Sequence, residues 1–128
     1  MTVLVLSVML PALAAPVDRV PEDFATIQDA VNKGEAPVIR VGPGDWKGAV
    51  IDRPVAILGH ESHIVSGPSV RGARAGFTVT GRADGAEIRG FSFQCDGPTL
   101  DMGVYSSTRQ FGRADNVVVA ENVFSQCV

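Results

Sequence analysis

The sequence has little of several features on which whole classes of protein depend. Of its 128 residues only 6% are aromatic, and 11 Lys and Arg stand against 14 Asp and Glu. The net charge of −3 offers no basic surface, so we expect no nucleic-acid partner. The two cysteines, Cys95 and Cys127, match no zinc-ligand spacing and form no C-x-x-C pair. A chain of this length forms at most one domain.

No hydrophobic run is long enough to span a bilayer. Residues 3–15 read VLVLSVMLPALAA, short of the roughly 20 residues that a membrane helix needs. The small-x-small ending predicts a secretory signal peptide at residues 1–15, cut after Ala14 or Ala15, and hence a secreted or periplasmic protein. Because the start Met1-Thr2 carries no Lys or Arg, a buried N-terminal strand or a misplaced start codon remains an alternative.

The sequence is instead rich in glycine, proline and short β-branched runs. Its 14 Gly and 8 Pro separate runs that are too short for helices. In residues 38–41, Ile39 and Val41 point to one side and Arg40 to the other, which is typical of a half-buried strand. This pattern recurs, and it predicts strands at 38–41, 49–51, 55–58, 64–65, 77–79, 87–88, 91–93, 104–105, 117–119 and 123–124.

One helix is predicted, at residues 24–34. Thr26 and the residue three positions on have the spacing of a capping box, and Ile27 and Val31 share one face. Gly34 suits the left-handed position that often follows a helix. Because two helical turns are not stable alone in water, we expect this helix to lie against the first strands.

Two internal repeats predict that the strands stack in layers. Residues 55–59 align with 77–81 at a spacing of 22, and residues 88–93 align with 119–124 at a spacing of 31. The longer interval contains residues 98–115, which we interpret as a loop inserted into one repeat. A period of about 20–30 residues with several strands in each unit is typical of a solenoid.

Stacked layers have consequences for particular residues. If Cys95 and Cys127 lie above one another in adjacent layers, they can form a disulfide worth roughly 3–4 kcal/mol; two buried free thiols are the alternative. Asn122 is expected at a corner, where it tolerates left-handed backbone. Residues 42–48, GPGDWKG, are expected to form another corner rather than a phosphate loop, because no helix follows them.

These stretches resemble the N-terminal part of right-handed parallel β-helix proteins, the pectin-lyase-like superfamily. FATIQDAVNKG resembles the N-terminal capping helix of that family, and VIRVGPGDWKG resembles its first strand and PGxY corner, with Trp46 in place of Tyr. AVIDRPVAILGHES resembles the VxIxKPxxLxG layer, and GFTVTGRADGAEIRGFSF and NVVVAENVFSQC resemble later coils.

The resemblance implies an all-β fold, a right-handed parallel β-helix solenoid with a short N-terminal capping α-helix, over residues 16–128. The chain stops directly after a predicted strand, and we expect these residues to be the N-terminal coils of a longer β-helix or a truncated product. A true stop at residue 128 would leave an uncapped C-terminal edge open to self-association.

The function that the resemblance implies is binding or processing of an extracellular polysaccharide, by a lyase or hydrolase if catalytic. The candidate catalytic residues are Asp96, Asp101, Arg89 and Arg109, and Trp46 and Tyr105 are candidates for stacking on a sugar ring. The simpler interpretation is that these carboxylates cap turns and these arginines keep strand faces soluble. The competing function is a non-catalytic β-helix scaffold for surface attachment, assembly or periplasmic metal delivery.

No cofactor is evident from the residues themselves. Ca²⁺ is implied only by the lyases of that superfamily, which use it to neutralise a uronate, and it needs several oxygen ligands. His60 and His63 lie in a predicted loop without a third ligand, so no metal site is predicted there.

Overall fold

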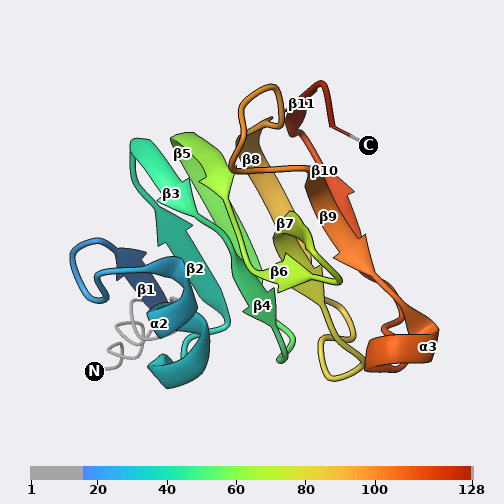
Figure 1. The fold of residues 1–128 in the computed structure, drawn as a ribbon. Helices are drawn as coiled ribbons and strands as arrows, with labels where there is room; N and C mark the ends of the chain where they lie inside the picture. The colour runs from blue at the N-terminus through green and yellow to red at the C-terminus, as the bar shows by residue number, and fades with distance from the viewer. Residues whose placement is uncertain (1–15, 128) are drawn as a thin grey trace, which may run out of the picture.

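The computed structural model describes residues 16–127, and the predicted signal peptide at residues 1–15 lies outside them. The chain folds mostly into β-strands, which form a seven-stranded and a four-stranded sheet (Figure 1). Apart from the β6–β7 hairpin, the described strand pairs are parallel. Within residues 16–127, no helix is long and apolar enough to cross a membrane.

The elements follow one another along the chain with short connections. They are β1 (Val17–Val20), α2 (Ile27–Lys33), β2 (Val38–Val41), β3 (Gly44–Lys47), β4 (Ala49–Ile51), β5 (Ala56–Ser66), β6 (Ser69–Val70), β7 (Ala73–Val79), β8 (Glu87–Gln94), β9 (Met102–Ser106), α3 (Thr108–Phe111), β10 (Val118–Ala120) and β11 (Val123–Ser125).

Each predicted strand overlaps an observed one, and β2 and β4 have the predicted bounds. The predicted runs 55–58 and 64–65 belong to one continuous strand, β5. Three strands were not predicted: β1, β6 and β3, the last of which lies inside the expected corner at residues 42–48. β3 forms because β5 offers its backbone alongside, and Trp46 pairs with Ile64 across the two strands.

The seven-stranded sheet confirms the longer of the two repeats. Glu87 pairs in register with Ala56 on one side and Val118 on the other, so neighbouring strands lie 31 residues apart. The repeat at a spacing of 22 is wrong, because Phe77 pairs with Ala49 in the other sheet. Residues 98–115 are not simply a loop, since they contain β9 and α3.

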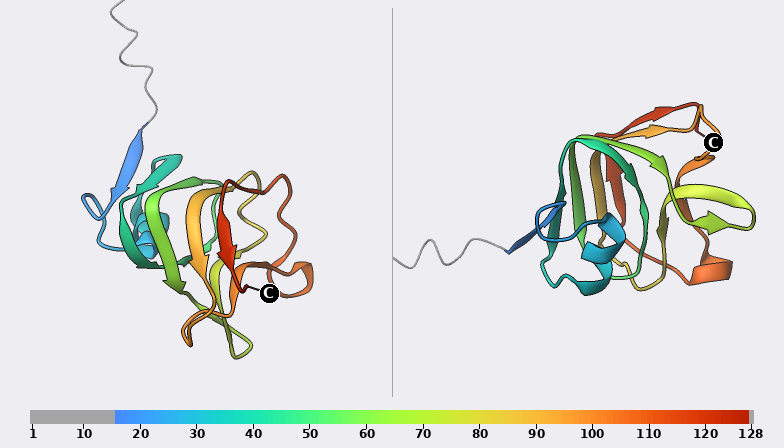
Figure 2. Two further views of the ribbon diagram at one scale, coloured as in Figure 1. Left: turned by 90° about the horizontal axis from the view of Figure 1, so that it is seen from above. Right: turned by 60° about the vertical axis from the view of Figure 1, so that its left-hand side comes forward.

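The two sheets lie on opposite sides of a common interior, as Figure 2 shows. Inward side chains of parallel strands stack in rows, and one such row joins the fully buried Ile39, Ile57 and Ile88. A second row joins Ile64 and Phe93, both also fully buried. Burial of each large apolar side chain contributes roughly 1.5–3 kcal/mol, so these rows supply the main stabilisation of the sheet.

Asn122 does not take the left-handed backbone that was expected of it. The residue with positive φ is its neighbour Glu121, at 60°. The Asn122 side chain instead bridges two strands: its Oδ1 accepts from the Phe91 amide at 2.9 Å, and its Nδ2 donates to the Ile88 carbonyl at 2.9 Å. The amide therefore replaces backbone hydrogen bonds where the strands bend.

Helix α2 lies at the β1–β2 end of the sheets (Figure 1). It is shorter than the predicted range 24–34, but Thr26 caps its start as the capping-box spacing predicted. The Asp29 amide donates to Thr26 Oγ1 at 3.0 Å, while Ile27 and Val31 are buried. Gly34 does not adopt the predicted left-handed conformation, since its φ is −73°. Glycine is required there because the Asp18 carboxylate and a helix carbonyl occupy the position that a Cβ would take.

The C-terminal end of α2 is capped by Arg53 from the turn after β4. Its guanidinium donates to the carbonyls of Val31 and Ala36 at 2.9 Å each and of Ala30 at 3.2 Å. Carbonyls at the end of a helix have no intrahelical partner, so this cation meets both their hydrogen-bonding need and the negative end of the dipole.

We expect Arg53→Met to lower the free energy of unfolding by about 2–3 kcal/mol, because charge-assisted hydrogen bonds to three carbonyls are lost. Because methionine keeps an unbranched apolar side chain, the loss of stability reports on the guanidinium. Urea unfolding measures it, with Arg82→Met on an exposed turn as the control. Equal stability of the two variants would contradict the capping role.

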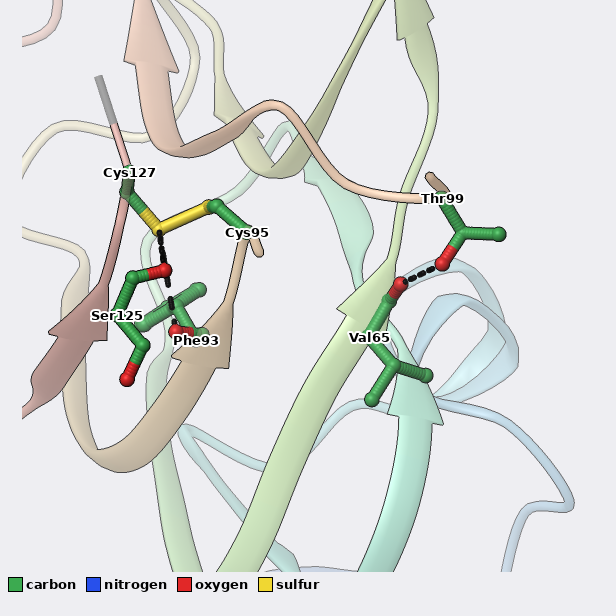
Figure 3. The surroundings of a disulfide bond; sticks show 6 residues. All are labelled: Val65, Phe93, Cys95, Thr99, Ser125 and Cys127. Carbon is green, nitrogen blue, oxygen red and sulfur yellow. Dashed lines mark hydrogen bonds between the residues drawn. A yellow bond between two sulfur atoms is a disulfide. The ribbon is translucent and has the colours of Figure 1, made fainter. Parts of the chain in front are cut away.

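Cys95 and Cys127 form a disulfide, which settles the alternative left open by the sequence (Figure 3). Cys95 follows β8 and Cys127 follows β11, and their Cα atoms are 4.9 Å apart. The Cys95 amide also donates to the Ser125 carbonyl at 3.0 Å. The bond therefore ties together two strands that are neighbours in the sheet.

Candidate functional site

Arg89 lies on the outer face of β8, as predicted from its buried neighbours Ile88 and Phe91. Its Nε donates to Glu87 at 2.9 Å, and one terminal nitrogen lies 3.5 Å from the Glu121 carboxylate. The hydrogen bond to Glu87, together with the charges of both carboxylates, raises the pKa of the guanidinium above its usual value. Arg89 is therefore held as a paired cation.

The candidate carboxylates belong to the connection between β8 and β9. Asp101 caps the β6–β7 hairpin: its Oδ2 accepts from the Arg74 amide at 2.8 Å, and its own amide donates to the Arg74 carbonyl at 2.9 Å. Asp96 is exposed. Arg109 belongs to α3, and its side chain lies outside what the structure describes. Asp101 and Arg89 thus engage different partners on different sheets.

The two candidate stacking residues also lie on different sheets. Trp46, in β3, packs partly against the core, and its Nε1 donates to the Gly42 carbonyl at 2.9 Å. Tyr105, in β9, is half-buried and meets the Phe111 ring edge-on at a centroid distance of 6.3 Å. The structure does not join them into one platform.

A pocket of about 170 Å³ opens where β1 and β2 end and β5 bends. Arg19 and Arg40 line it from β1 and β2, with Glu22, Leu58 and His60 around them. Arg19 and Arg40 pair directly across the parallel strands, so both side chains lie on the outer face of the seven-stranded sheet. We call this feature the arginine pocket.

Two like charges opposite one another on neighbouring strands are unfavourable. Within residues 16–127, neither guanidinium of the arginine pocket takes part in an ion pair. An anion placed between Arg19 and Arg40 would relieve this repulsion, and arginine suits a carboxylate, sulfate or phosphate because its N–H groups match two oxygens at once. The volume suits such a group rather than a whole buried ligand.

No known protein family, curated protein or solved structure matches this chain. Its function therefore has to be inferred from its own residues.

The sequence did not reveal the arginine pocket, because residues 15–22 are a polar, proline-containing segment after the predicted signal peptide and no strand was predicted there. A repeated sequence pattern could have predicted the pair: VDRV at Val17–Val20 and VIRV at Val38–Val41 both read V-x-R-V. Read as neighbouring parallel strands, the two segments place their arginines side by side, as the structure does.

Calcium, which the resemblance implies, needs several oxygen ligands close together. Within residues 16–127, no group of three or more His, Cys, Asp or Glu side chains is arranged to hold a metal ion. Asp101 already accepts a backbone hydrogen bond, and His63 Nδ1 lies 3.2 Å from the Asp45 carboxylate.

Proposed function

We propose that the fold is a right-handed parallel β-helix with α2 as its N-terminal cap. Successive coils place their strands side by side. The first part of β5 pairs with β2, the second part of β5 pairs with β3, and β7 pairs with β4. In the next coil the two parts of β8 pair with the two parts of β5, and β9 pairs with β7. The right-handed form is the one that crossover connections between parallel strands almost always take. The coil-by-coil register is what supports this fold.

We propose that the protein is exported. The Cys95–Cys127 disulfide supports this, because such bonds form and persist in oxidising compartments and are rare in the cytosol. The apolar segment at residues 3–15, with its small-residue ending, agrees with a signal peptide.

We propose that the protein binds an acidic extracellular polysaccharide along the outer face of the seven-stranded sheet. The observation that carries the proposal is the arginine pocket, where Arg19 and Arg40 lie side by side without ion-pair partners among residues 16–127. A carboxylate or sulfate on one sugar would enter the pocket, and the chain would continue over the exposed strands. The polysaccharide class rests on the resemblance to β-helix proteins.

Binding without cleavage is the form of this function that the side chains favour. A lyase must remove a proton with a group that meets the substrate, whereas the Arg89 guanidinium is already engaged by Glu87 at 2.9 Å and by Glu121 at 3.5 Å. Asp101 serves the β6–β7 hairpin through its hydrogen bond to the Arg74 amide. We therefore assign no catalytic residue.

Calorimetric titration with polygalacturonate tests the proposal, because its methyl ester keeps the sugar chain and removes the charge. We expect the acid form to bind and the ester to bind at least roughly tenfold more weakly, since charge-assisted hydrogen bonds are lost. The double variant Arg19→Gln, Arg40→Gln should lose affinity for the acid form to the same extent.

Arg82→Gln is the matched control, because Arg82 is an exposed arginine on a turn far along the chain from the pocket. If Arg82→Gln and the double variant lowered the affinity for the acid form equally, the polymer would be held by general charge attraction and not by a specific site. Failure of the acid form to bind would reject an acidic sugar chain of this type, and release of new chain ends from the acid form would reject binding without cleavage.

A further inference from the structure

His60 forms the wall of the arginine pocket on the β5 side, and the proposed function gives it no role. Side chains alternate along a strand, and Ile57 of β5 is fully buried. Leu58 and, two residues further on, His60 therefore lie on the outer face of the sheet. Leu58 pairs with Arg40 across the strands, so this face of β5 continues the face that carries the arginines.

A buried hydroxyl group holds the backbone of His60 at the pocket. The side chain of Ser62 is only 1% exposed. Its Oγ accepts from the His60 amide at 2.9 Å and donates to the Gly42 carbonyl at the end of β2, at 2.7 Å. Because Gly42 also lines the pocket, the bend of β5 fixes His60 beside the ends of β1 and β2.

The charge of the pocket wall depends on the protonation of His60. The other ionisable side chains of the wall are Arg19, Glu22 and Arg40. Two arginines and one glutamate leave one positive charge, and protonation of His60 raises it to two. Within residues 16–127, neither Glu22 nor His60 takes part in an ion pair. An added positive charge would therefore act on a bound anion without being offset by a salt bridge.

The other charged groups beside His60 lie outside the pocket wall. Glu61 follows it in β5, and Arg89 lies on the neighbouring β8. The charge of Arg89 is offset by Glu87 and Glu121. Histidine is the side chain whose charge changes between about pH 5 and pH 8, whereas arginine and glutamate keep theirs over most of that range. The imidazole of His60 therefore sets how this pocket responds to pH.

We propose that His60 is the third anion-binding side chain of the arginine pocket, and that the pocket holds its anion more tightly when the imidazole is protonated. This inference rests on the proposed function and adds its regulation by pH. A protonated imidazole donates from both ring nitrogens, and its hydrogen bonds to an anion are charge-assisted. The protein would thus bind an acidic sugar chain tightly at mildly acidic pH and release it as the pH rises.

Calorimetric titration with polygalacturonate at about pH 5.5, 6.5 and 7.5 tests this role, because uronate carboxylates stay ionised over that range. We expect the unmutated chain to bind roughly fivefold more tightly at the lowest pH than at the highest. His60→Gln should remove this dependence, and His60→Lys should bind equally well throughout, because its charge is constant. His63→Gln is the matched control: His63 is the other histidine of the chain, it lies beside Asp45, and it should keep the dependence.

The imidazole signals of His60 in NMR spectra provide a second readout on the unmutated chain. Because binding and protonation are linked, saturation with polygalacturonate should move the titration midpoint of His60 to higher pH and leave that of His63 in place. An absence of binding at all three pH values would overturn the polysaccharide proposal and this inference together. Equal affinity at all three values, or a dependence that a folded His60→Gln variant retains, would overturn the role of His60 alone.

Discussion

Replacing Gly76 with alanine is expected to lower the free energy of unfolding by roughly 3 kcal/mol, the upper part of the range for overpacked interiors. Gly76 lies in β7 between Gly103 of β9 and Gly48, which directly precedes β4. An added Cβ would lie 2.7 Å from the Gly103 carbonyl oxygen, 2.9 Å from Phe93 Cε1 and 3.0 Å from Ile64 Cγ2.

The size of this effect follows from what the methyl group would meet. A flexible side chain could move away, but the Gly103 carbonyl belongs to a paired strand whose spacing of about 4.8 Å is fixed by its hydrogen bonds. The Phe93 ring cannot retreat either, because it is fully buried and stacked on Phe124. Relief would require the β7–β9 pairing to open.

Urea unfolding of Gly76→Ala measures the loss, with Gly97→Ala as the control. An added Cβ at Gly97 meets no atom within 4 Å, and the backbone there is not left-handed, so its stability should stay within about 0.5 kcal/mol. If the two variants were equally stable, the inference that β7 leaves no space for a Cβ at Gly76 would be wrong.

The class of secondary structure was predictable because it depends on local pattern. In residues 38–41 the alternation of apolar and charged side chains matches the buried Ile39 and Val41 and the exposed Arg40. The repeat at a spacing of 31 predicted the strand register for a related reason. Inward rows must be apolar in each strand, so Val119 and Phe124 align with Ile88 and Phe93.

Non-local pairing is what the local pattern could not supply. Residues 77–81 resemble residues 55–59 in composition, but strand partners are chosen by the whole path of the chain, and Phe77 joins the other sheet. Likewise Gly34 is a frequent helix-ending residue, yet its role here is to leave room for the Asp18 carboxylate from β1. That contact connects segments that are distant in the sequence.

The candidate site was the least predictable part for the same reason. Arg89 was correctly placed on an outer face, and its partner Glu87 lies two residues away on the same strand. Glu121, in contrast, becomes a neighbour only through the β8–β10 pairing. The Arg19–Arg40 pair required β1 to be recognised as a strand. If the register of the parallel strands is known, the neighbours of Arg89 and the Arg19–Arg40 pair can be assigned from the sequence.

Removing the Cys95–Cys127 disulfide is expected to have the other large effect, a loss of roughly 3–4 kcal/mol. The two cysteines are 32 residues apart, and closing a loop of this size in the unfolded chain accounts for stabilisation of that order. Domains of this size are typically stable by about 5–15 kcal/mol in total, so the double variant Cys95→Ala, Cys127→Ala should unfold at far lower urea concentration.

The position of the bond predicts where the loss appears first. β11 is exposed along its whole length and is held by β8 on one side only. Without the tether, its amides should exchange before those of β2 and β5, whose inward residues are fully buried. Urea unfolding with and without reductant checks the total: reductant should destabilise the unmutated chain and leave the double variant unchanged. If reductant did not change the stability of the unmutated chain, packing alone would hold β11. The exposed Val123 argues against that outcome, because it buries little apolar surface.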